Sequence, residues 1–219
     1  MIMTEKEAIL ARHSVRKYTN KAIDADIAAK IVEKVAEVNA ESGLHFQFLN
    51  DEGEAFSNLI LKFSGLDSAP ASIACVGPDT PDLDEKVGYY GEKIVLFLQT
   101  IGLNTCWVGS FSKKRSEAVV GAGERNVISI AVGYGENEGK THKSKSEDQL
   151  VDAAGERPEW FNEGVKAALL APTALNQQKF TIRLKDADAA EIVSTGGAFT
   201  GVDLGIVKYH FEVGSGRKL

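Results

Sequence analysis

The sequence is poor in several features that would mark particular classes of protein. It has only two cysteines, Cys75 and Cys106, which cannot form a disulfide scaffold and fit a reducing compartment. Its longest apolar run, at residues 94–98, is far shorter than the roughly 20 residues needed to span a bilayer. Cationic side chains are outnumbered, with 25 Lys and Arg against 31 Asp and Glu. Binding to nucleic acid or to an anionic membrane requires a dense cationic face, so neither is an expected partner.

The composition is otherwise that of an ordinary globular protein. Hydrophobic residues make up 43% and charged residues 26% of the 219 positions, which excludes disorder and collagen-like repeats. This length suffices for one large domain or for two small ones that share a core. The first ten residues, MIMTEKEAIL, already contain acids, so no secretory signal is expected. We therefore expect a soluble, cytoplasmic protein.

Hydrophobic periodicity predicts that helices and strands alternate along the chain. Thr4 and Glu7 have the spacing of a capping box, which predicts a short helix that ends near Arg12. Longer helices are predicted at 24–39, 82–101, 160–170 and 202–213, and strands at 45–49, 71–76, 127–132 and 180–184. Their order and spacing favour an α+β fold in which helices pack around mixed or antiparallel sheets.

The chain also resembles itself at an offset of 134 positions. The segment HFQFLND aligns with KFTIRLK, and the preceding helical residues 31–38 align with 165–172 without gaps. A second pair of helices, 85–101 and 202–213, aligns through Gly91 and Gly205. Any two amphipathic helix–loop–strand units look somewhat alike, so chance remains the alternative. A true repeat would mean two related αβ halves in one chain, residues 1–150 and a shorter 151–219, forming an internal pseudo-dimer.

Two basic clusters have the side chains that phosphate groups require. The first, Arg12-His13-Ser14-Val15-Arg16-Lys17, places two guanidiniums, a hydroxyl and an ammonium within six residues. Guanidiniums offer fixed bidentate donors to phosphate, and serine adds a short one. The second cluster, His142-Lys143-Ser144-Lys145-Ser146, follows a strand and a glycine-rich turn. For both clusters the alternative is a solvated basic surface loop.

Two further segments are uncharged but suited to contact with a heterocycle. Residues 171–178, APTALNQQ, offer amide donors and acceptors directly after an apolar helix. They could bind the polar edge of a ring, or simply cap the helix and begin a strand. In residues 102–111, GLNTCWVGSF, Gly109 would let backbone N–H groups approach a ligand closely. The alternative there is a helix end entering a core strand, with Trp107 in packing; no histidine is spaced to activate Cys106.

Several common motifs are missing. Residues 133–139, GYGENEG, follow a strand but have the spacing G-x-G-x-x-x-G and open no helix, which argues against a dinucleotide-binding fingerprint. Neither G-x-x-x-x-G-K-[ST] nor G-x-S-x-G occurs. The four histidines do not pair at metal-ligand spacings and C-x-x-C is absent, so no zinc site is expected.

Taken together, RHSVRKY, GLNTCWVG, KSKS and APTALNQQ resemble the nitroreductase family of FMN-dependent oxidoreductases. In ordinary members an A-P-S-x-x-N-x-Q loop comes early, and two identical chains exchange it to build each flavin site. Here the early position holds Asn39-Ala-Glu-Ser-Gly43, and the matching loop lies at 171–178. This arrangement resembles a smaller branch of the family in which one chain carries both halves, the second half completing the flavin site.

The resemblance implies a role for individual residues. Arg12 and Ser14 would hold the FMN phosphate and ribityl end, with Lys143 and Lys145 closing on the phosphate and His13 contributing less specifically. Arg16 would lie at the N1/O2 edge of the ring, where reduction places negative charge. The remaining cofactor-binding residues are Pro172, Thr173 and Ala174 along the isoalloxazine, Asn176 at its pyrimidine edge, and Val108, Gly109 and Ser110, with a backbone N–H of Gly109 or Ser110 pointing at N5. No catalytic side chain is expected, because the cofactor carries the chemistry.

The implied function is that of an NAD(P)H oxidoreductase, which passes a hydride through FMN to a nitroaromatic, a quinone or a similar small acceptor. One FMN per chain is expected, because no R-x-S-x-R precedes the second helix at residues 156–160. Two alternatives stay open: a flavin-binding or flavin-less protein of this fold without turnover, and a binding module for phosphate or nucleotide ligands. The chain could act as a monomer or as a homodimer.

Overall fold

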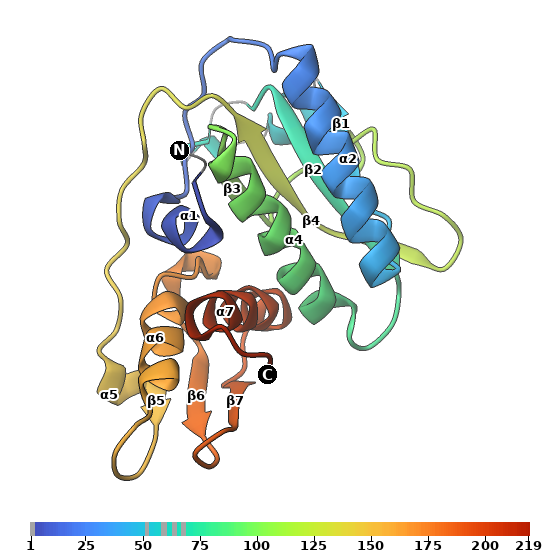
Figure 1. Cartoon of the computed structure of the whole chain (residues 1–219). Helices are drawn as coiled ribbons and strands as arrows, with labels where there is room; N and C mark the ends of the chain where they lie inside the picture. The colour runs from blue at the N-terminus through green and yellow to red at the C-terminus, as the bar shows by residue number, and fades with distance from the viewer. Residues whose placement is uncertain (1–2, 51–52, 58–60, 63–64, 67–68) are drawn as a thin grey trace.

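The computed structural model describes residues 3–50, 53–57, 61–62, 65–66 and 69–219, which form two sheets and the helices around them (Figure 1). The larger sheet has the order β1-β2-β4-β3, and all neighbouring strands are antiparallel. Its strands are β1 (Gln47–Asn50), β2 (Ala71–Pro78), β3 (Asn104–Val108) and β4 (Glu124–Gly133). In the smaller sheet, β6 (Phe180–Leu184) pairs parallel with β5 (Val151–Asp152) and antiparallel with β7 (Ala190–Ser194). These sheets and helices confirm the predicted α+β class.

The helices begin and end close to where the sequence predicts. The Thr4 hydroxyl accepts from the Glu7 backbone and the Glu7 carboxylate accepts from the Thr4 backbone, which confirms the capping box. Gly43, at φ 71°, ends the second helix in the left-handed conformation that glycine adopts readily. The helices are α1 (Glu5–Ala11), α2 (Ala25–Ser42), α4 (Leu83–Thr100), α5 (Glu147–Leu150), α6 (Glu159–Ala168) and α7 (Thr200–Ser215), with 3-10 turns at Gly53–Phe56 and Ala174–Asn176. No helix in the described ranges is long and apolar enough to cross a bilayer.

Helices α2 and α4 cover one face of the larger sheet (Figure 1). The side chains of β4 alternate: Ile130 and Val132 join the core beneath the helices, whereas Ala131 faces a second apolar cluster on the opposite face. That second cluster also contains Val15 and Val108. The chain after α1, which carries the basic cluster, therefore runs along the sheet edge beside β3, with Val15 packed in this second apolar cluster.

Helices α4 and α7 cross in close contact through two glycines. A methyl group added to Gly88 would lie 2.0 Å from the Val202 carbonyl oxygen, and one added to Gly205 would lie 2.0 Å from the Glu85 carbonyl oxygen. Glu85 and Val202, like Gly88 and Gly205, are 117 positions apart, so the two contacts are reciprocal, as across a two-fold axis. Gly91, which the sequence alignment paired with Gly205, lies instead under the Trp107 ring.

The two segments that meet at this crossing have the same order of elements. Apart from 3-10 turns, the described elements of the first are α2-β1-β2-α4 and those of the second are α6-β6-β7-α7, and in each the two strands pair antiparallel. At the offset of 134 the first residue of α2 falls on the first residue of α6. The offset shortens to 117 at the last helix, because the connection between β1 and β2 is longer than that between β6 and β7.

A long connecting segment, residues 134–146, joins β4 to α5 and runs down one side of the molecule from the larger sheet to the smaller one (Figure 1). Near its start, Gly135 forms a bridge with Tyr18, and the Glu136 amide donates to the Lys17 carbonyl at 3.0 Å. The segment therefore lies against the chain that follows α1, and it carries Lys143 and Lys145 toward the smaller sheet.

Candidate functional site

The basic loop, residues 12–17, is held beside β3 in extended form. Ser14 forms a parallel bridge with Thr105, and the Val15 amide donates to the Thr105 carbonyl at 3.0 Å. Alternate residues of extended chain share a side, which groups Arg12, Ser14 and Arg16. All three residues affect the pKa of the Cys106 thiol. Burial raises this pKa, while the charges of Arg16 and Arg12 and a hydrogen bond with Ser14 act to lower it.

Arg12 and His13 carry buried nitrogens that the protein does not satisfy. Arg12 is only 4% exposed, and its Nη2 donates to the Leu170 carbonyl at 3.5 Å. Within the described ranges, Arg12 Nε and His13 Nδ1 are buried and have no hydrogen-bond partner. The other ring nitrogen of His13 lies 2.9 Å from the Thr141 hydroxyl. Unsatisfied polar atoms of this kind are uncommon in folded proteins and mark a place where a polar ligand can bind.

Glu92 of α4 lies behind Arg12 and is completely buried. One carboxylate oxygen is 3.7 Å from Arg12 Nε and accepts from His210 Nε2 at 2.8 Å; the other accepts from Trp107 Nε1 at 2.8 Å. Burial by itself would raise the pKa of Glu92, but the hydrogen bond and charge of His210, the charge of Arg12 and the Trp107 donor together lower it. The carboxylate is therefore ionised at neutral pH.

Cationic and donor groups gather at the C-terminal end of α6. The Ala167 carbonyl accepts from His210 Nδ1 at 3.1 Å, and the Leu169 carbonyl accepts from His142 at 3.0 Å. These carbonyls form the negative end of the helix dipole, which favours positive groups. Burial lowers the pKa of His142, and the positive charges of Arg12 and His210 lower it further, although its bond to Leu169 acts in the opposite direction. Histidines and arginine from three different elements thus meet at one point.

The amide loop, residues 171–178, begins at that point and has a constrained backbone. Leu175, Asn176 and Gln178 adopt positive φ angles of 52°, 52° and 44°, which non-glycine residues take at a cost. Asp203 of α7 holds the loop: its carboxylate accepts from the Ala174 amide at 2.9 Å and from Gln177 Nε2 at 2.7 Å. Burial raises the pKa of Asp203, and these two hydrogen bonds offset part of that effect.

The connecting segment and the amide loop are hydrogen-bonded to each other. Lys145 Nζ donates to the carbonyls of Gln177 at 2.8 Å and Gln178 at 3.0 Å, and its backbone amide donates to the Gln178 side chain at 2.7 Å. Asn176 Nδ2 donates to the Lys143 carbonyl at 2.8 Å. Lys145 and Asn176, both expected at the ligand, thus also fix the loop, while the Lys143 side chain is exposed.

Gly109 follows β3 and lies under an aromatic side chain from the second segment. A methyl group at Gly109 would lie 2.7 Å from the ring of Phe199, so any side chain there would have to displace this ring. Phe199 has a left-handed φ of 60° and is 43% exposed. Val108 is buried in the sheet, whereas Ser110 is exposed. The Phe199 ring therefore covers Gly109 at the end of β3.

The structure thus brings together most of the residues predicted for the site. Arg12 and His13 meet the connecting segment and the end of α6, and Pro172, Thr173 and Ala174 follow at once in the amide loop. Sequence reasoning missed Glu92, His210, Asp203 and Phe199. The signal for Glu92 and His210 was a polar residue on the buried face of an otherwise apolar helix. No cluster of three or more His, Cys, Asp or Glu that could bind a metal occurs in the described part of the chain.

Comparisons with known proteins show a family and a shared fold. The family described as "Putative TM nitroreductase" matches residues 4–215. A putative nitroreductase from Thermotoga maritima has a similar structure, with a TM-score of 0.70 and 24% identity over 97% of this chain and 84% of that one.

Two other similar structures cover less of this chain. The nitroreductase family protein from Streptococcus pneumoniae has a TM-score of 0.55 and 15% identity, over 67% of this chain and 98% of that one. A protein from Parabacteroides distasonis, named as a putative NADH dehydrogenase/NAD(P)H nitroreductase, has a TM-score of 0.54 and 18% identity, over 69% and 98%. At these identities the structures show a shared fold. A comparison with curated protein sequences gave no match.

Proposed function

The chain belongs to the nitroreductase family described as "Putative TM nitroreductase", and on that premise we propose that it is an FMN-dependent NAD(P)H oxidoreductase. Its acceptor would be a nitroaromatic, a quinone or a similar small molecule. The Parabacteroides distasonis protein of the same fold is named as an NAD(P)H nitroreductase, which supports a nicotinamide electron donor. FMN would supply the redox chemistry, accepting hydride at N5 and passing it to the acceptor.

One observation carries the proposal: three segments far apart in sequence converge at the C-terminal end of α6. The basic loop contributes Arg12 and His13, the connecting segment contributes Lys143 and Lys145, and the amide loop begins at Ala171. A phosphate-bearing, planar heterocycle needs cations at one end and uncharged hydrogen-bonding groups at the other. This convergence supplies both.

The residues present fit an FMN phosphate. His13 Nδ1 is buried and has no hydrogen-bond partner among the described residues, and an oxyanion beside it would supply one. Arg12, whose Nε faces Glu92 and whose Nη2 is directed to Leu170, would offer its remaining guanidinium donors. Ser14 extends on the same side as Arg12 and would bind the phosphate or ribityl oxygens. Arg16, exposed at the end of the loop, would place a fixed positive charge at the N1/O2 edge of the ring.

The amide loop and β3 would hold the ring itself. Asp203 and Lys145 fix the loop, so that Pro172, Thr173 and Ala174 would line the ring without rearrangement. Asn176 would bind the pyrimidine edge, for which its amide would exchange its bond to the Lys143 carbonyl. Val108 is buried at the end of β3, and directly after it a backbone N–H of Gly109 or Ser110 would point at N5.

We further propose that residues 1–150 and 151–219 are the two halves of a pseudo-dimer that binds one FMN. The reciprocal contacts of Gly88 and Gly205 support a pseudo-two-fold relation between them. At the same offset of 117, the buried pair Glu92 and His210 corresponds to Tyr209 and Lys93, which line a cavity of about 520 Å³.

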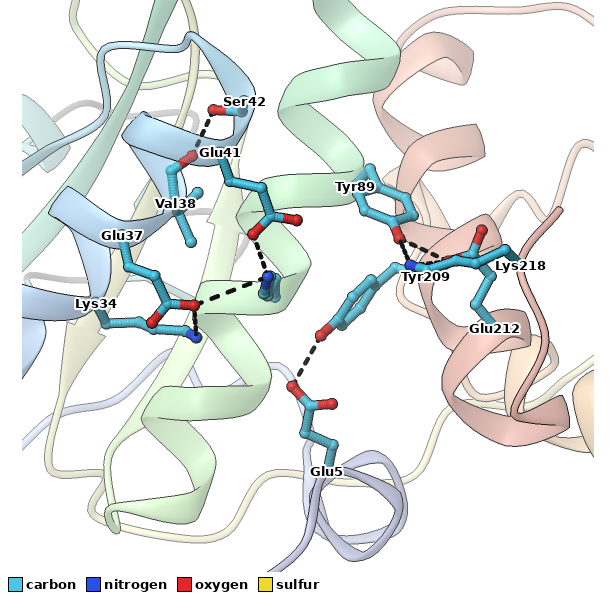
Figure 2. A network of polar contacts seen from close by, with 11 residues as sticks. Glu5, Lys34, Glu37, Val38, Glu41, Ser42, Tyr89, Tyr209, Glu212 and Lys218 are labelled. Atoms are coloured by element: carbon cyan, nitrogen blue, oxygen red, sulfur yellow. Dashed lines mark hydrogen bonds and ion pairs between the residues drawn. The ribbon is translucent and has the colours of Figure 1, made fainter.

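In that second cavity the protein's own groups are paired with one another (Figure 2). The Tyr209 hydroxyl donates to Glu5 at 2.8 Å, Glu212 accepts from Tyr89 at 2.6 Å and from Lys218 at 2.6 Å, and Lys93 pairs with Glu41. Lys93 and Lys218 there already have carboxylate partners, which argues against a second phosphate at this place.

The proposal is tested by anaerobic reduction of the FMN-loaded protein. Adding NADH or NADPH should bleach the flavin absorbance bands, and adding a nitroaromatic or quinone should restore them. The control variant Arg183→Ala, altered at a part-exposed residue in the smaller sheet, should behave as the wild type. Flavin absorbance that neither nucleotide bleaches would contradict an oxidoreductase and leave a flavin-binding protein.

A further inference from the structure

A buried polar cluster lies directly behind the proposed phosphate site. It consists of Glu92 on α4, Trp107 on β3, His210 on α7 and Arg12 after α1, so it joins both of the segments that cross at the glycines. Glu92 and His210 are fully buried and Arg12 nearly so. Neither Glu92 nor His210 has a part in the hydride transfer proposed above. Burying a carboxylate such as Glu92 costs folding free energy unless it is paired and hydrogen-bonded.

The ring of His210 bridges Glu92 and the end of α6. A backbone carbonyl can only accept, so Nδ1, which lies 3.1 Å from the Ala167 oxygen, donates to it. Nε2 lies 2.8 Å from Glu92 Oε1. Because both ring nitrogens have partners, the His210 ring fixes the position of the Glu92 carboxylate relative to α6.

Glu92 is placed to fix the Arg12 guanidinium. Its Oε1 lies 3.7 Å from Arg12 Nε, too long for a hydrogen bond but close enough for strong attraction at a buried site. The carboxylate is itself held by His210 and Trp107 and cannot follow the arginine if it swings away. Arg12 Nη2 is at the same time directed to the Leu170 carbonyl. A guanidinium held from two sides presents its remaining donors in a fixed direction.

We propose that Glu92 is a positioning residue, which holds Arg12 in the orientation that binds the phosphate group of a flavin nucleotide. This inference rests on the proposed function, because it takes Arg12 as a phosphate ligand. His210 and Trp107 act through Glu92, so the docking of α7 on α4 helps to form a phosphate site on a different element.

The corresponding place in the other segment lacks this arrangement. At the offset of 117, Tyr209 stands for Glu92 and Lys93 for His210. Tyr209 donates to Glu5 and Lys93 pairs with Glu41, and both of these carboxylates are exposed, unlike the buried Glu92. The cluster is thus confined to the side where the basic loop lies, as expected for a device that serves phosphate binding rather than the helix crossing in general.

The test compares the affinities of FMN and riboflavin, which differ only by the phosphate. The ratio of the two affinities measures the phosphate contribution alone. In Glu92→Gln this ratio should fall about tenfold, the loss expected for one charge-assisted hydrogen bond, while riboflavin binding changes less than about twofold. The matched control is Glu85→Gln, a carboxylate on the same helix that pairs with Lys208 of α7 at 2.5 Å and is part-exposed. The control should keep the wild-type ratio.

A second variant guards against misfolding of the first. Glu92→Asp keeps the charge but withdraws the carboxylate by one methylene, and it should also lower the ratio, by less than Glu92→Gln does. An unchanged ratio in both variants, an equal loss of FMN and riboflavin, or a higher ratio would overturn the inference while leaving the proposed function intact. A wild-type protein that binds FMN no tighter than riboflavin would instead overturn the phosphate site and with it this inference.

Discussion

The crossing of α4 and α7 gives a prediction whose size follows from the structure. In Gly205→Ala the new methyl would lie 2.0 Å from the Glu85 carbonyl oxygen and 2.5 Å from the Tyr89 amide nitrogen. Both are backbone atoms of a buried helix and cannot turn aside, so the helices must separate by about 1 Å in a close-packed interior. Overpacking of this kind costs about 1–3 kcal/mol, and more where backbone moves. Replacing a helical glycine by alanine returns up to about 1 kcal/mol, which leaves a net loss of about 2 kcal/mol at the upper end of that range, the end expected where backbone atoms clash.

The reciprocal variant makes the prediction sharper. In Gly88→Ala the methyl would lie 2.0 Å from the Val202 carbonyl oxygen, so the loss of unfolding free energy should be similar. The double variant should cost less than the sum of the two, because one separation of the helices accommodates both methyl groups. Urea denaturation followed by circular dichroism measures all three, with Lys208→Ala, which breaks only a part-exposed ion pair between the same helices, as the control at about 1 kcal/mol or less. Stable single variants, or full additivity in the double variant, would refute the close crossing.

Four further predictions concern the site. Arg12→Ala should weaken FMN binding at least tenfold by titration, through loss of a charged phosphate ligand, and an unchanged affinity would remove Arg12 from the site. Arg16→Ala should lower the flavin midpoint potential more than it lowers FMN affinity, and an unchanged potential would contradict its place at the N1/O2 edge. Asp203→Ala should release the amide loop, seen as faster hydrogen exchange there with a stability loss of about 1–3 kcal/mol; unaltered exchange would show that the loop does not depend on it. The folded protein lowers the pKa of Glu92 below its ordinary value of 4.5, so the ionised carboxylate stabilises the fold above that pH. The stability difference between wild type and Glu92→Gln should therefore shrink as the pH falls below 4.5. A stability difference that grows on acidification would contradict this sign.

The sequence alone predicts most of the fold, because its main elements carry strong local signals. The capping box at Thr4 predicts the start of a helix and Gly43 predicts the end of one. The apolar period of α4 predicts its buried face. The strand at 180–184 is placed without error. In contrast, β7 (Ala190–Ser194) was not predicted, because it is short and polar at both ends and forms only through its pairing with β6.

The site is less accessible from the sequence, because its geometry comes from tertiary contacts. The sequence shows which basic and amide residues are present. It does not show that Lys145 would be hydrogen-bonded to the amide loop, or Asn176 to the connecting segment. Glu92 and His210 are 118 positions apart and meet only when α7 docks on α4. Local pattern carries no information on such a pair. The left-handed Phe199 is likewise set by its surroundings, since phenylalanine has no intrinsic preference for that conformation.

The central claim, a single composite FMN site in each chain, is tested most directly by the flavin content of the purified protein. The visible absorbance spectrum is recorded, the protein is denatured, and the released FMN is measured against the protein concentration. The account predicts one FMN per chain, either as purified or after incubation with FMN and removal of the excess. No bound flavin even after that incubation would contradict the proposed site. A ratio near two would contradict the argument that the charged groups lining the second cavity are paired with one another and bind no second phosphate.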